Sequence, residues 1–203
     1  MSPFDVILFD VGGVLLTNGW DHRERAAAVV QFQLDAQELE TRHEKVAPSW
    51  ERGEIDLKAY LDAAVFYEPR SFSREEFFDF MLAQSRLLDD GAMGILKEVS
   101  ASNGCMVGAL NNEARETNEF RFGKFDLRHY FKVALSSCYV GLRKPELAIY
   151  RRALDILGSP PSRVLFIDDR EENVAGAAAA GIMAIRFTGE MALNQELERL
   201  GVV

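Results

Sequence analysis

Several features that mark particular classes of protein are missing from this chain of 203 residues. Its two cysteines, Cys105 and Cys138, are too few for a disulfide framework, and both lie in or near apolar runs, so we expect reduced, buried thiols. No apolar run approaches the ~20 residues that span a bilayer, and no basic segment precedes an apolar stretch at the N-terminus. These absences predict a cytoplasmic protein without a membrane partner.

Positive charge is also scarce. The formal net charge is −9, and no block of lysine and arginine offsets it, which disfavours nucleic acid as a partner. The sequence has no Gly-x-Ser-x-Gly, Gly-x-Gly-x-x-Gly or phosphate-binding Gly-Lys-Ser/Thr motif. Its histidines, His22, His43 and His129, lie far apart in the sequence and do not suggest a zinc site. A phosphate ligand is still compatible, because local cations or helix N-termini concentrate positive field at one point.

What the sequence does contain is a series of short apolar runs separated by helical segments. The runs are continuously apolar rather than alternating, which is typical of parallel strands covered on both faces. They lie at residues 6–9, 105–110, 133–135, 164–167 and 183–187. Helical patterns at 91–101, 145–157 and 171–180 separate the later runs. This alternation predicts an α/β fold with a doubly wound, Rossmann-like parallel sheet.

Residues that favour helix ends support these boundaries. Pro145 is placed for the first position of the helix at 145–157, and Gly158 follows its last turn. Gly181 suits the position just after the helix at 171–180. Ser73 with Glu76 three residues later forms a capping box, which predicts a further helix start.

The region after the first run breaks the pattern. No strand is evident from about residue 20 to 88, whereas 23–33, 35–46, 56–66 and 74–87 have helical patterns. Because ordinary strand-to-helix connections are short, we interpret this region as an inserted, all-helical cap over the strand ends. We therefore expect residues 1–16 and 89–203 to form an α/β core domain and residues 17–88 to form the cap domain.

Carboxylates follow two of the buried runs. Asp10 ends the first run, where α/β sheets bind ligands, and Gly12 and Gly13 let the backbone approach such a ligand; the alternative interpretation is a turn capped by Asp10. Asp168 and Asp169 end a later run. Hard oxygen ligands of this kind suit Mg²⁺. Capping of the following helix explains one of the two carboxylates but not the second.

Polar residues at two further positions are compatible with phosphate binding. Lys144 immediately precedes a predicted helix, whose N-terminal N–H groups favour anions. Asn111 and Asn112 follow the second apolar run, and their amides are hydrogen-bond donors. Taken singly, these residues are better explained as a solvated lysine and a turn of asparagines.

In this order, the residues resemble the four short motifs that the haloacid dehalogenase-like superfamily places on consecutive strand ends. The resemblance extends from Phe9 to about Ala180, and the segments 141–150 and 166–173 are similar to sugar-phosphatase-like members with a helical cap inserted after the first motif. It implies an Mg²⁺-dependent hydrolase, and above all a phosphatase acting on a small phosphorylated metabolite such as a sugar phosphate.

The resemblance also implies catalytic and phosphate-binding roles. Asp10 corresponds to the nucleophile that forms an aspartyl-phosphate, and Lys144 to the lysine that neutralises both nucleophile and phosphate. Asn111 and Asn112 correspond to the phosphate-binding motif. Because a phosphate dianion repels an aspartate, attack requires cations at both, and Lys144 with Mg²⁺ would supply them.

A magnesium site is implied at the same strand ends. Asp10, the Gly12 carbonyl, Asp168 and Asp169 correspond to the residues that hold the metal, with Asp169 expected as a direct ligand. Asn173, four residues beyond Asp169, corresponds to an outer-sphere partner.

Two positions depart from the usual pattern of phosphatases in this superfamily. Asn111 replaces Ser or Thr, and Gly12 replaces an aspartate that serves as general acid and base, a loss that typically costs about 10²–10⁴ in rate. Three interpretations follow. The chain is a phosphatase for substrates with a good leaving group, such as glycosyl 1-phosphates; a halide-releasing hydrolase, which needs no metal; or a catalytically impaired module that binds a phosphorylated ligand or a protein.

The predicted cap is expected to exclude water and select the substrate. Thr17, Asn18 and Trp20 are placed to face the cleft, and Trp50 and Tyr67 are candidates for lining it. Aromatic residues at helical spacing are more often part of a core. The aromatic-rich cap is also compatible with a dimer interface, so a monomer and a homodimer both remain open.

Overall fold

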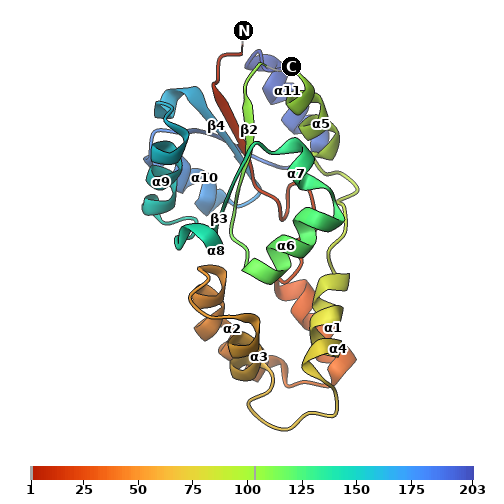
Figure 1. The fold of residues 1–203 in the computed structure, drawn as a ribbon. Coiled ribbons are helices and arrows are strands. Elements are labelled where there is room, and N and C mark those ends of the chain that lie inside the picture. The colour runs from red at the N-terminus through yellow and green to blue at the C-terminus, as the bar shows by residue number, and fades with distance from the viewer. Residues whose placement is uncertain (1, 103) are drawn as a thin grey trace.

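The computed structural model describes residues 2–102 and 104–203, and its elements follow the predicted alternation (Figure 1). The strands form one sheet in the order β3-β2-β1-β4-β5, and every neighbouring pair is parallel. Their bounds are β1 Val6–Phe9, β2 Met106–Asn111, β3 Val133–Ser136, β4 Val164–Asp168 and β5 Met183–Arg186. The predicted α/β fold with a doubly wound parallel sheet is confirmed.

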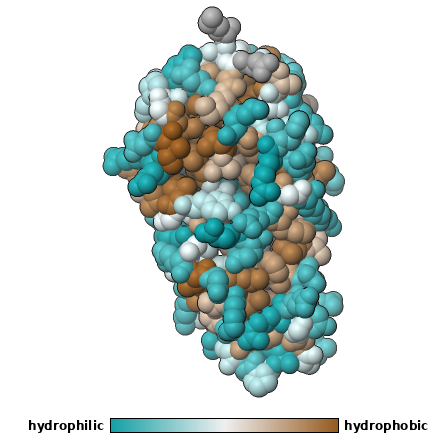
Figure 2. All heavy atoms as spheres, viewed as in Figure 1, coloured by the Kyte–Doolittle hydropathy of each residue, from teal (hydrophilic) through white to brown (hydrophobic). Residues whose placement is uncertain are grey.

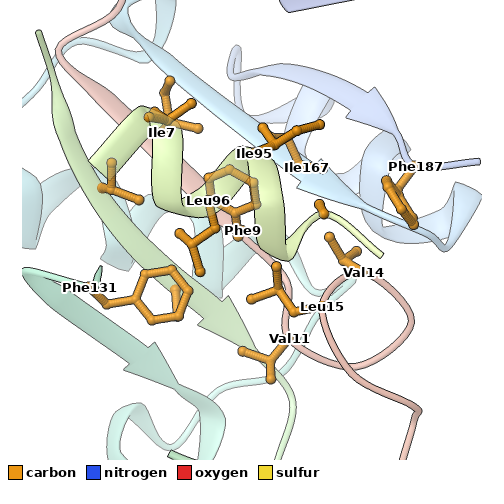
Figure 3. Packing of buried hydrophobic residues seen from close by; sticks show 14 of the residues in the cluster. Ile7, Phe9, Val11, Val14, Leu15, Ile95, Leu96, Phe131, Ile167 and Phe187 are labelled. Carbon is orange, nitrogen blue, oxygen red and sulfur yellow. The ribbon is translucent and has the colours of Figure 1, made fainter. Parts of the chain in front are cut away.

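Helices cover both faces of the sheet. α5 (Met93–Ala101) and α11 (Glu190–Arg199) contribute to the cluster on one face, and α9 (Leu147–Leu157) and α10 (Glu171–Ala179) to the cluster on the other. Because successive side chains of a strand point to opposite faces, Ile7 and Phe9 enter the first cluster (Figure 3) and Val6 and Leu8 enter the second. Coverage of both faces explains why the strand sequences are continuously apolar.

The register of the sheet brings the polar strand ends to one edge. Phe9 pairs with Ala109 of β2 and with Ile167 of β4. The residues that follow Phe9 and Ile167 are Asp10 and Asp168, which therefore lie level with each other at the carboxyl end of the sheet.

Helices between β1 and α5 occupy the other part of the molecule, beyond the carboxyl ends of the strands (Figure 1). They are α1 His22–Phe32, α2 Ala36–Glu51, α3 Leu57–Ala64 and α4 Arg74–Ala83. They share a hydrophobic cluster of their own, distinct from the two clusters of the sheet. In it, the ring of Phe77 contacts the rings of Trp20, Phe32 and Phe72 at centroid distances of 5.6, 4.9 and 5.8 Å. The predicted capping box of Ser73 is present at the start of α4.

Some predicted boundaries are wrong. Pro145 does not occupy the first position of α9, because Glu146 is the N-cap and the helix begins at Leu147. α2 continues through Pro48 to Glu51, beyond its predicted end, whereas α4 ends at Ala83 rather than in the segment up to residue 87. Four helices had no prediction: α6 Arg115–Lys124, α7 Leu127–Tyr130, α8 Ser137–Val140 and α11.

The surface mixes polar and apolar residues. On the face shown in Figure 2, hydrophilic and hydrophobic residues are interspersed over both parts of the molecule. Exposed large apolar side chains, among them Val30, Ile156 and Met191, come from separate helices. Within residues 2–102 and 104–203, no helix combines the length and the apolar character needed to cross a membrane.

Truncation of Phe77 tests the cluster of the inserted helices. Phe77→Ala removes a fully buried ring and leaves a cavity, so we expect the free energy of unfolding to fall by about 3–5 kcal/mol. The matched control is Val30→Ala in α1, where the side chain is 80% exposed and the expected change is within about 0.5 kcal/mol. Urea unfolding of both variants measures the difference, and equal effects would contradict the packing described.

Candidate active site

Three carboxylates meet at the carboxyl end of the sheet. Asp10 follows β1, Asp168 ends β4 and Asp169 is the next residue. One oxygen from each lies within 4.8 Å of the others. The backbone N–H of Val11 donates to Asp10 Oδ1 over 2.8 Å and fixes that carboxylate. The structure thus brings together the three acidic residues that the sequence singled out.

Lys144 lies between two of these carboxylates. Its Nζ is 2.9 Å from Asp10 Oδ1 and 2.6 Å from Asp168 Oδ2, and the residue is 3% exposed. Burial disfavours the charge, but the two carboxylates outweigh this and raise the pKa of Lys144. For Asp10, burial outweighs the attraction of Lys144 and raises the pKa to about 7. The Lys144 ammonium group is therefore held in its charged form beside a carboxyl group whose pKa lies near 7.

The segment that carries Lys144 is held by Asn112. The Asn112 amide donates to the carbonyl of Lys144 and accepts from its N–H, both over 2.9 Å. This pair of hydrogen bonds attaches the loop before α9 to the end of β2, and Asn112 also lines the cleft described below.

Asn111 has a different environment. Its side chain is buried, donates to Asn118 Oδ1 over 3.0 Å and accepts from the Ser136 hydroxyl over 2.8 Å. Ser136 also donates to Asn118, so the three side chains form a closed network between β2, β3 and α6. Asn111 is not among the cleft-lining residues. The structure therefore brings Asn112, but not the side chain of Asn111, to the site.

The acidic pair divides into one satisfied and one unsatisfied carboxylate. The Asp168 carboxylate accepts hydrogen bonds from the Lys144 ammonium group and from the backbone N–H of Arg170. Asn173 Nδ2 donates to both of its oxygens, over 2.9 and 3.0 Å. Asp169 Oδ1 is buried without a hydrogen-bond partner among the described residues. Burial and the neighbouring Asp168 raise the pKa of Asp169.

This orphaned oxygen fits a hard divalent cation. A buried carboxylate oxygen without a partner is costly, and Mg²⁺ is commonly held by one or two carboxylates together with waters and phosphate. Gly13 has φ +74°, and a Cβ built on it would overlap the Asp169 carboxylate, so glycine leaves the space that this carboxylate occupies. The donor set of Asp10 and Asp169, supported by Asp168, is chemically suited to magnesium.

A cleft of about 450 Å³ opens onto Asp10 and Lys144 from the side of the inserted helices. Of the residues expected to face it, Asn18, Trp20 and Trp50 do line it, whereas Thr17 and Tyr67 do not. The Thr17 hydroxyl instead donates to Gln84 O over 2.8 Å, and Tyr67 packs beneath the guanidinium of Arg42.

Several lining residues had no role in the sequence analysis. They are mostly charged and come from both parts of the molecule: Arg25, His43, Glu51, Glu113, Arg121, Arg143 and Arg170. Glu113, Thr117 and Arg121 recur at intervals of four, which is the spacing that aligns side chains on one helix face. That spacing is a signal the sequence contained, although α6 had no prediction.

His43 is held by a chain of hydrogen-bonding groups. Trp20 Nε1 donates to the Tyr60 hydroxyl over 2.6 Å, and this hydroxyl lies 2.8 Å from His43 Nδ1. Burial, reinforced by the charge of Arg25, lowers the pKa of His43 to about 4. At neutral pH the cleft therefore contains an uncharged imidazole.

A model of the haloacid dehalogenase-like hydrolases matches residues 4–181 of the chain. This match covers most of the sequence and includes Asp10, Lys144 and the acidic pair at the strand ends. The chain belongs to this family of hydrolases.

Similar proteins include phosphatases. Sesquiterpene phosphatase astK of Aspergillus oryzae is 25% identical over 98% of this chain and 97% of its own length. Flavin mononucleotide hydrolase 1 of Arabidopsis thaliana is 30% identical over 81% of this chain and 65% of its own length. The chain spans only 36% of the length of another relative, drimenol cyclase drtB of Aspergillus calidoustus, with 27% identity.

Solved structures share the fold. A HAD family enzyme from Bacteroides thetaiotaomicron, in its magnesium complex, has a TM-score of 0.77 and 20% identity over 93% of this chain and 95% of its own. An L-2-haloacid dehalogenase from Xanthobacter autotrophicus has a TM-score of 0.65 and 18% identity over 98% of this chain and 84% of its own. These two likenesses show the fold alone, because one fold can host different activities.

Magnesium binding is tested through stability. We expect Mg²⁺ at 100-fold its dissociation constant to stabilise the native protein by about 2.7 kcal/mol. Asp169→Asn should be at least as stable as the native chain without metal, because it removes an unpartnered carboxylate beside Asp168, and should lose the response to Mg²⁺. Thermal unfolding with Mg²⁺ and with chelator measures both effects. The control Glu172→Gln should keep the response; an undiminished response in Asp169→Asn would exclude the proposed ligand.

The raised pKa of Asp10 predicts how metal-free stability depends on pH. The folded chain keeps a proton on Asp10 that the unfolded chain releases above about pH 4. This contribution to stability is complete below about pH 4 and is lost as the pH rises through about 7. We expect the unfolding free energy of the native chain, relative to Asp10→Asn, to fall by up to about 1.4 kcal/mol per pH unit in that window. Urea unfolding in chelator at pH 5 to 8 tests this, and a constant difference would contradict it.

Proposed function

We propose that this hydrolase is a magnesium-dependent phosphatase that acts on a small phosphorylated metabolite through an aspartyl-phosphate on Asp10. The observation that carries the proposal is the arrangement around Asp10. Its carboxylate lies 2.9 Å from a buried ammonium group and beside Asp169, which has a buried oxygen in need of a cation. With a divalent cation bound, such a site would concentrate positive charge where a phosphoryl group meets the nucleophile.

The reaction has two displacements. In the first, a carboxylate oxygen of Asp10 attacks phosphorus, and the bond from phosphorus to the leaving-group oxygen breaks. In the second, water attacks phosphorus, the bond to Asp10 breaks, and inorganic phosphate and the free carboxylate are produced. Dividing one displacement into two is the purpose of a covalent intermediate. Lys144 stabilises the negative charge of Asp10 and of the phosphoryl oxygens in both.

Asp10, Asp169 and the Gly12 carbonyl would hold the metal, and Asp168 would support them through Lys144 and Asn173. When bound, Mg²⁺ supplies positive charge to the nucleophile and the phosphoryl oxygens. The remaining contributions are those of the chain itself: Asn112 orients the segment of Lys144, and Val11 N–H orients Asp10.

The lining of the cleft supports a polar, sugar-like substrate. Most lining side chains are charged or polar, and the apolar ones are few, among them Trp20, Ala47 and Trp50. Gly12 offers no acid for the leaving group. A leaving group that is stable as an anion, such as that of a glycosyl 1-phosphate, needs the least help. The similarity to two phosphatases supports the reaction class. The names of these relatives refer to a sesquiterpene and to flavin mononucleotide, which differ from the sugar-like substrate proposed here.

We also propose that residues 17–88 act as a cap domain and residues 1–16 and 89–203 as the core. The separate hydrophobic cluster of α1–α4 supports this division, as does the position of the cleft between these helices and the strand ends. In this arrangement the cap excludes water and selects the leaving group, while the core performs the chemistry.

The two alternatives are less well supported. A halide-releasing hydrolase needs no metal for its reaction. That function would not explain why Asp169, beside the nucleophile, has a buried carboxylate oxygen without a partner among the described residues. A catalytically impaired binding module gives no reason for an aspartate nucleophile that is held in contact with a buried lysine.

Hydrolysis of p-nitrophenyl phosphate tests the proposal, because its good leaving group makes the glycine at position 12 matter least. We expect turnover with Mg²⁺, none with chelator, and a loss of at least about 10³-fold in Asp10→Asn, since the nucleophile is removed. Asp155→Asn, on the surface of α9, is the control for loss of one carboxylate and should match the native chain. Metal-independent release of fluoride or chloride from haloacids would contradict the proposal. So would the absence of turnover in folded protein across a panel of sugar phosphates.

A further inference from the structure

The space beside the nucleophile at Gly12 is bordered by two polar groups. A Cβ built on Gly12 would lie 3.0 Å from Asn18 Oδ1 and 3.8 Å from Arg121 Nη1. Position 12 is two residues after Asp10, and it has no side chain that can transfer a proton. Any proton acceptor for this side of the cleft must therefore come from another element.

Arg121 brings a carboxylate to this position. The residue is 2% exposed, and its guanidinium donates to the carbonyls of Thr17 and Asn18. Its charge is balanced by Glu113, whose Oε2 lies 2.5 Å from the same Nη1 that borders Gly12. The same Nη1 thus lies near both the Glu113 carboxylate and the position that a side chain of residue 12 would occupy.

Glu113 is held in place from several directions. The Thr117 hydroxyl donates to its Oε1 over 2.7 Å, and its backbone N–H donates to the Ser137 hydroxyl over 2.9 Å. Glu113 lines the same cleft as Asp10 and Lys144. A fixed carboxylate with one face in the substrate cleft has the properties of a positioned proton acceptor.

Two other carboxylates of the cleft pair with different arginines. Asp21 caps α1 and pairs with Arg170, and Glu51 pairs with Arg143. Glu113 instead pairs with the guanidinium that borders Gly12. Glu113 is the carboxylate that the geometry connects to this position.

We propose that Glu113 is the general base of the second displacement, in place of the side chain that Gly12 lacks. The inference rests on the proposed phosphatase activity. The Glu113 carboxylate takes a proton from water as the water oxygen bonds to phosphorus and the bond between phosphorus and Asp10 breaks. The products are inorganic phosphate, the free Asp10 carboxylate and a protonated Glu113, which returns its proton to solvent.

The proposed role concerns the second displacement alone. Glu113 contacts the Arg121 guanidinium at 2.5 Å and lines the cleft. In this role Glu113 assists attack by water, and position 12 supplies no acid for the first displacement. This division of roles agrees with substrates whose leaving group needs no protonation.

The lifetime of the phosphoenzyme tests this role. With Mg²⁺ and p-nitrophenyl phosphate, we expect Glu113→Gln to release one p-nitrophenolate per chain at close to the native rate. The phosphoenzyme should then accumulate, with its decay slowed by about 10²–10⁴-fold. Rapid mixing followed by acid quenching measures both steps. Glu119→Gln, at an exposed position of helix α6, which follows Glu113, is the control and should decay like the native chain.

A second variant separates catalysis from charge balance. Glu113→Asp keeps a carboxylate for Arg121 but withdraws it by one methylene, so it should fold like the native chain and still slow phosphoenzyme decay by at least about 10-fold. If Glu113 only balances the charge of Arg121, Glu113→Asp will decay at the native rate, and the proposal is overturned. This variant also decides the question if Glu113→Gln does not fold.

Restoring a carboxylate at position 12 provides a rescue. The backbone at Gly12 does not have a positive φ, and a Cβ there requires only a small shift of the Asn18 amide. In Glu113→Gln, the additional change Gly12→Asp should recover part of the lost decay rate, because the new carboxylate would lie beside Arg121. Native decay in Glu113→Gln would refute the role of Glu113 while leaving the phosphatase intact. Absence of any phosphoenzyme in the native chain would instead refute the proposed function itself.

Discussion

Lys144 places its ammonium group within 2.9 Å of Asp10 and 2.6 Å of Asp168, where all three side chains are largely removed from water. A buried charge without partners is costly, and removing either partner leaves the other uncompensated. The ends of β1 and β4 and the loop before α9 must therefore meet within hydrogen-bonding distance. The hydrogen bonds of Asn112 to Lys144 and of Asn173 to Asp168 hold these segments together, and they fix the geometry around Asp10.

The two chain segments that connect the inserted helices to the rest of the protein lie side by side and are contacted by α6. Thr17 pairs with the returning segment, accepting from Arg86 N–H and donating to Arg86 O, so the two connections lie together. Arg121 and Lys124, both on α6, donate to the carbonyls of Thr17 and Ser85 respectively. A helix that follows β2 thus holds both connections. Arg121 also borders Gly12, so one side chain contacts both the connection to the inserted helices and the position beside Asp10.

Much of the fold could be predicted because its signals are local. Continuous apolar runs show strands with both faces covered, and parallel strands necessarily place their carboxyl ends at one edge. These two signals were enough to predict that Asp10, Asp168 and Asp169 lie at the same edge of the sheet. The all-helical character of the insertion was predicted from local periodicity as well, whereas the order of the strands in the sheet was not predicted. Helix ends were less predictable, since Pro145 has a backbone that fits before the N-cap as well as after it.

The remaining part of the site depends on contacts that no local pattern contains. Arg121 reaches residues about 100 positions away in the sequence, and its partner Glu113 precedes a helix whose mean apolar content is low. Asn111 illustrates the converse. Its position at a strand end is that of a ligand-binding residue, but Ser136 and Asn118 use its hydrogen-bonding groups inside the protein. Spacing predicts which residues reach an edge, and only the packing decides which of them face the cleft.

Charge pairing in the cleft constrains what the enzyme can bind. Arg25, Arg121, Arg143 and Arg170 each already contact a carboxylate. Among these pairs Arg121–Glu113 is buried, and a second anionic group that displaced Glu113 from Arg121 would leave a buried charge without its partner, which is costly. Lys144, by contrast, lies between Asp10 and Asp168, and in the proposed mechanism it meets the phosphoryl group. For the proposed phosphatase, the pairing of the arginines therefore favours a substrate whose only ionised group is the phosphate.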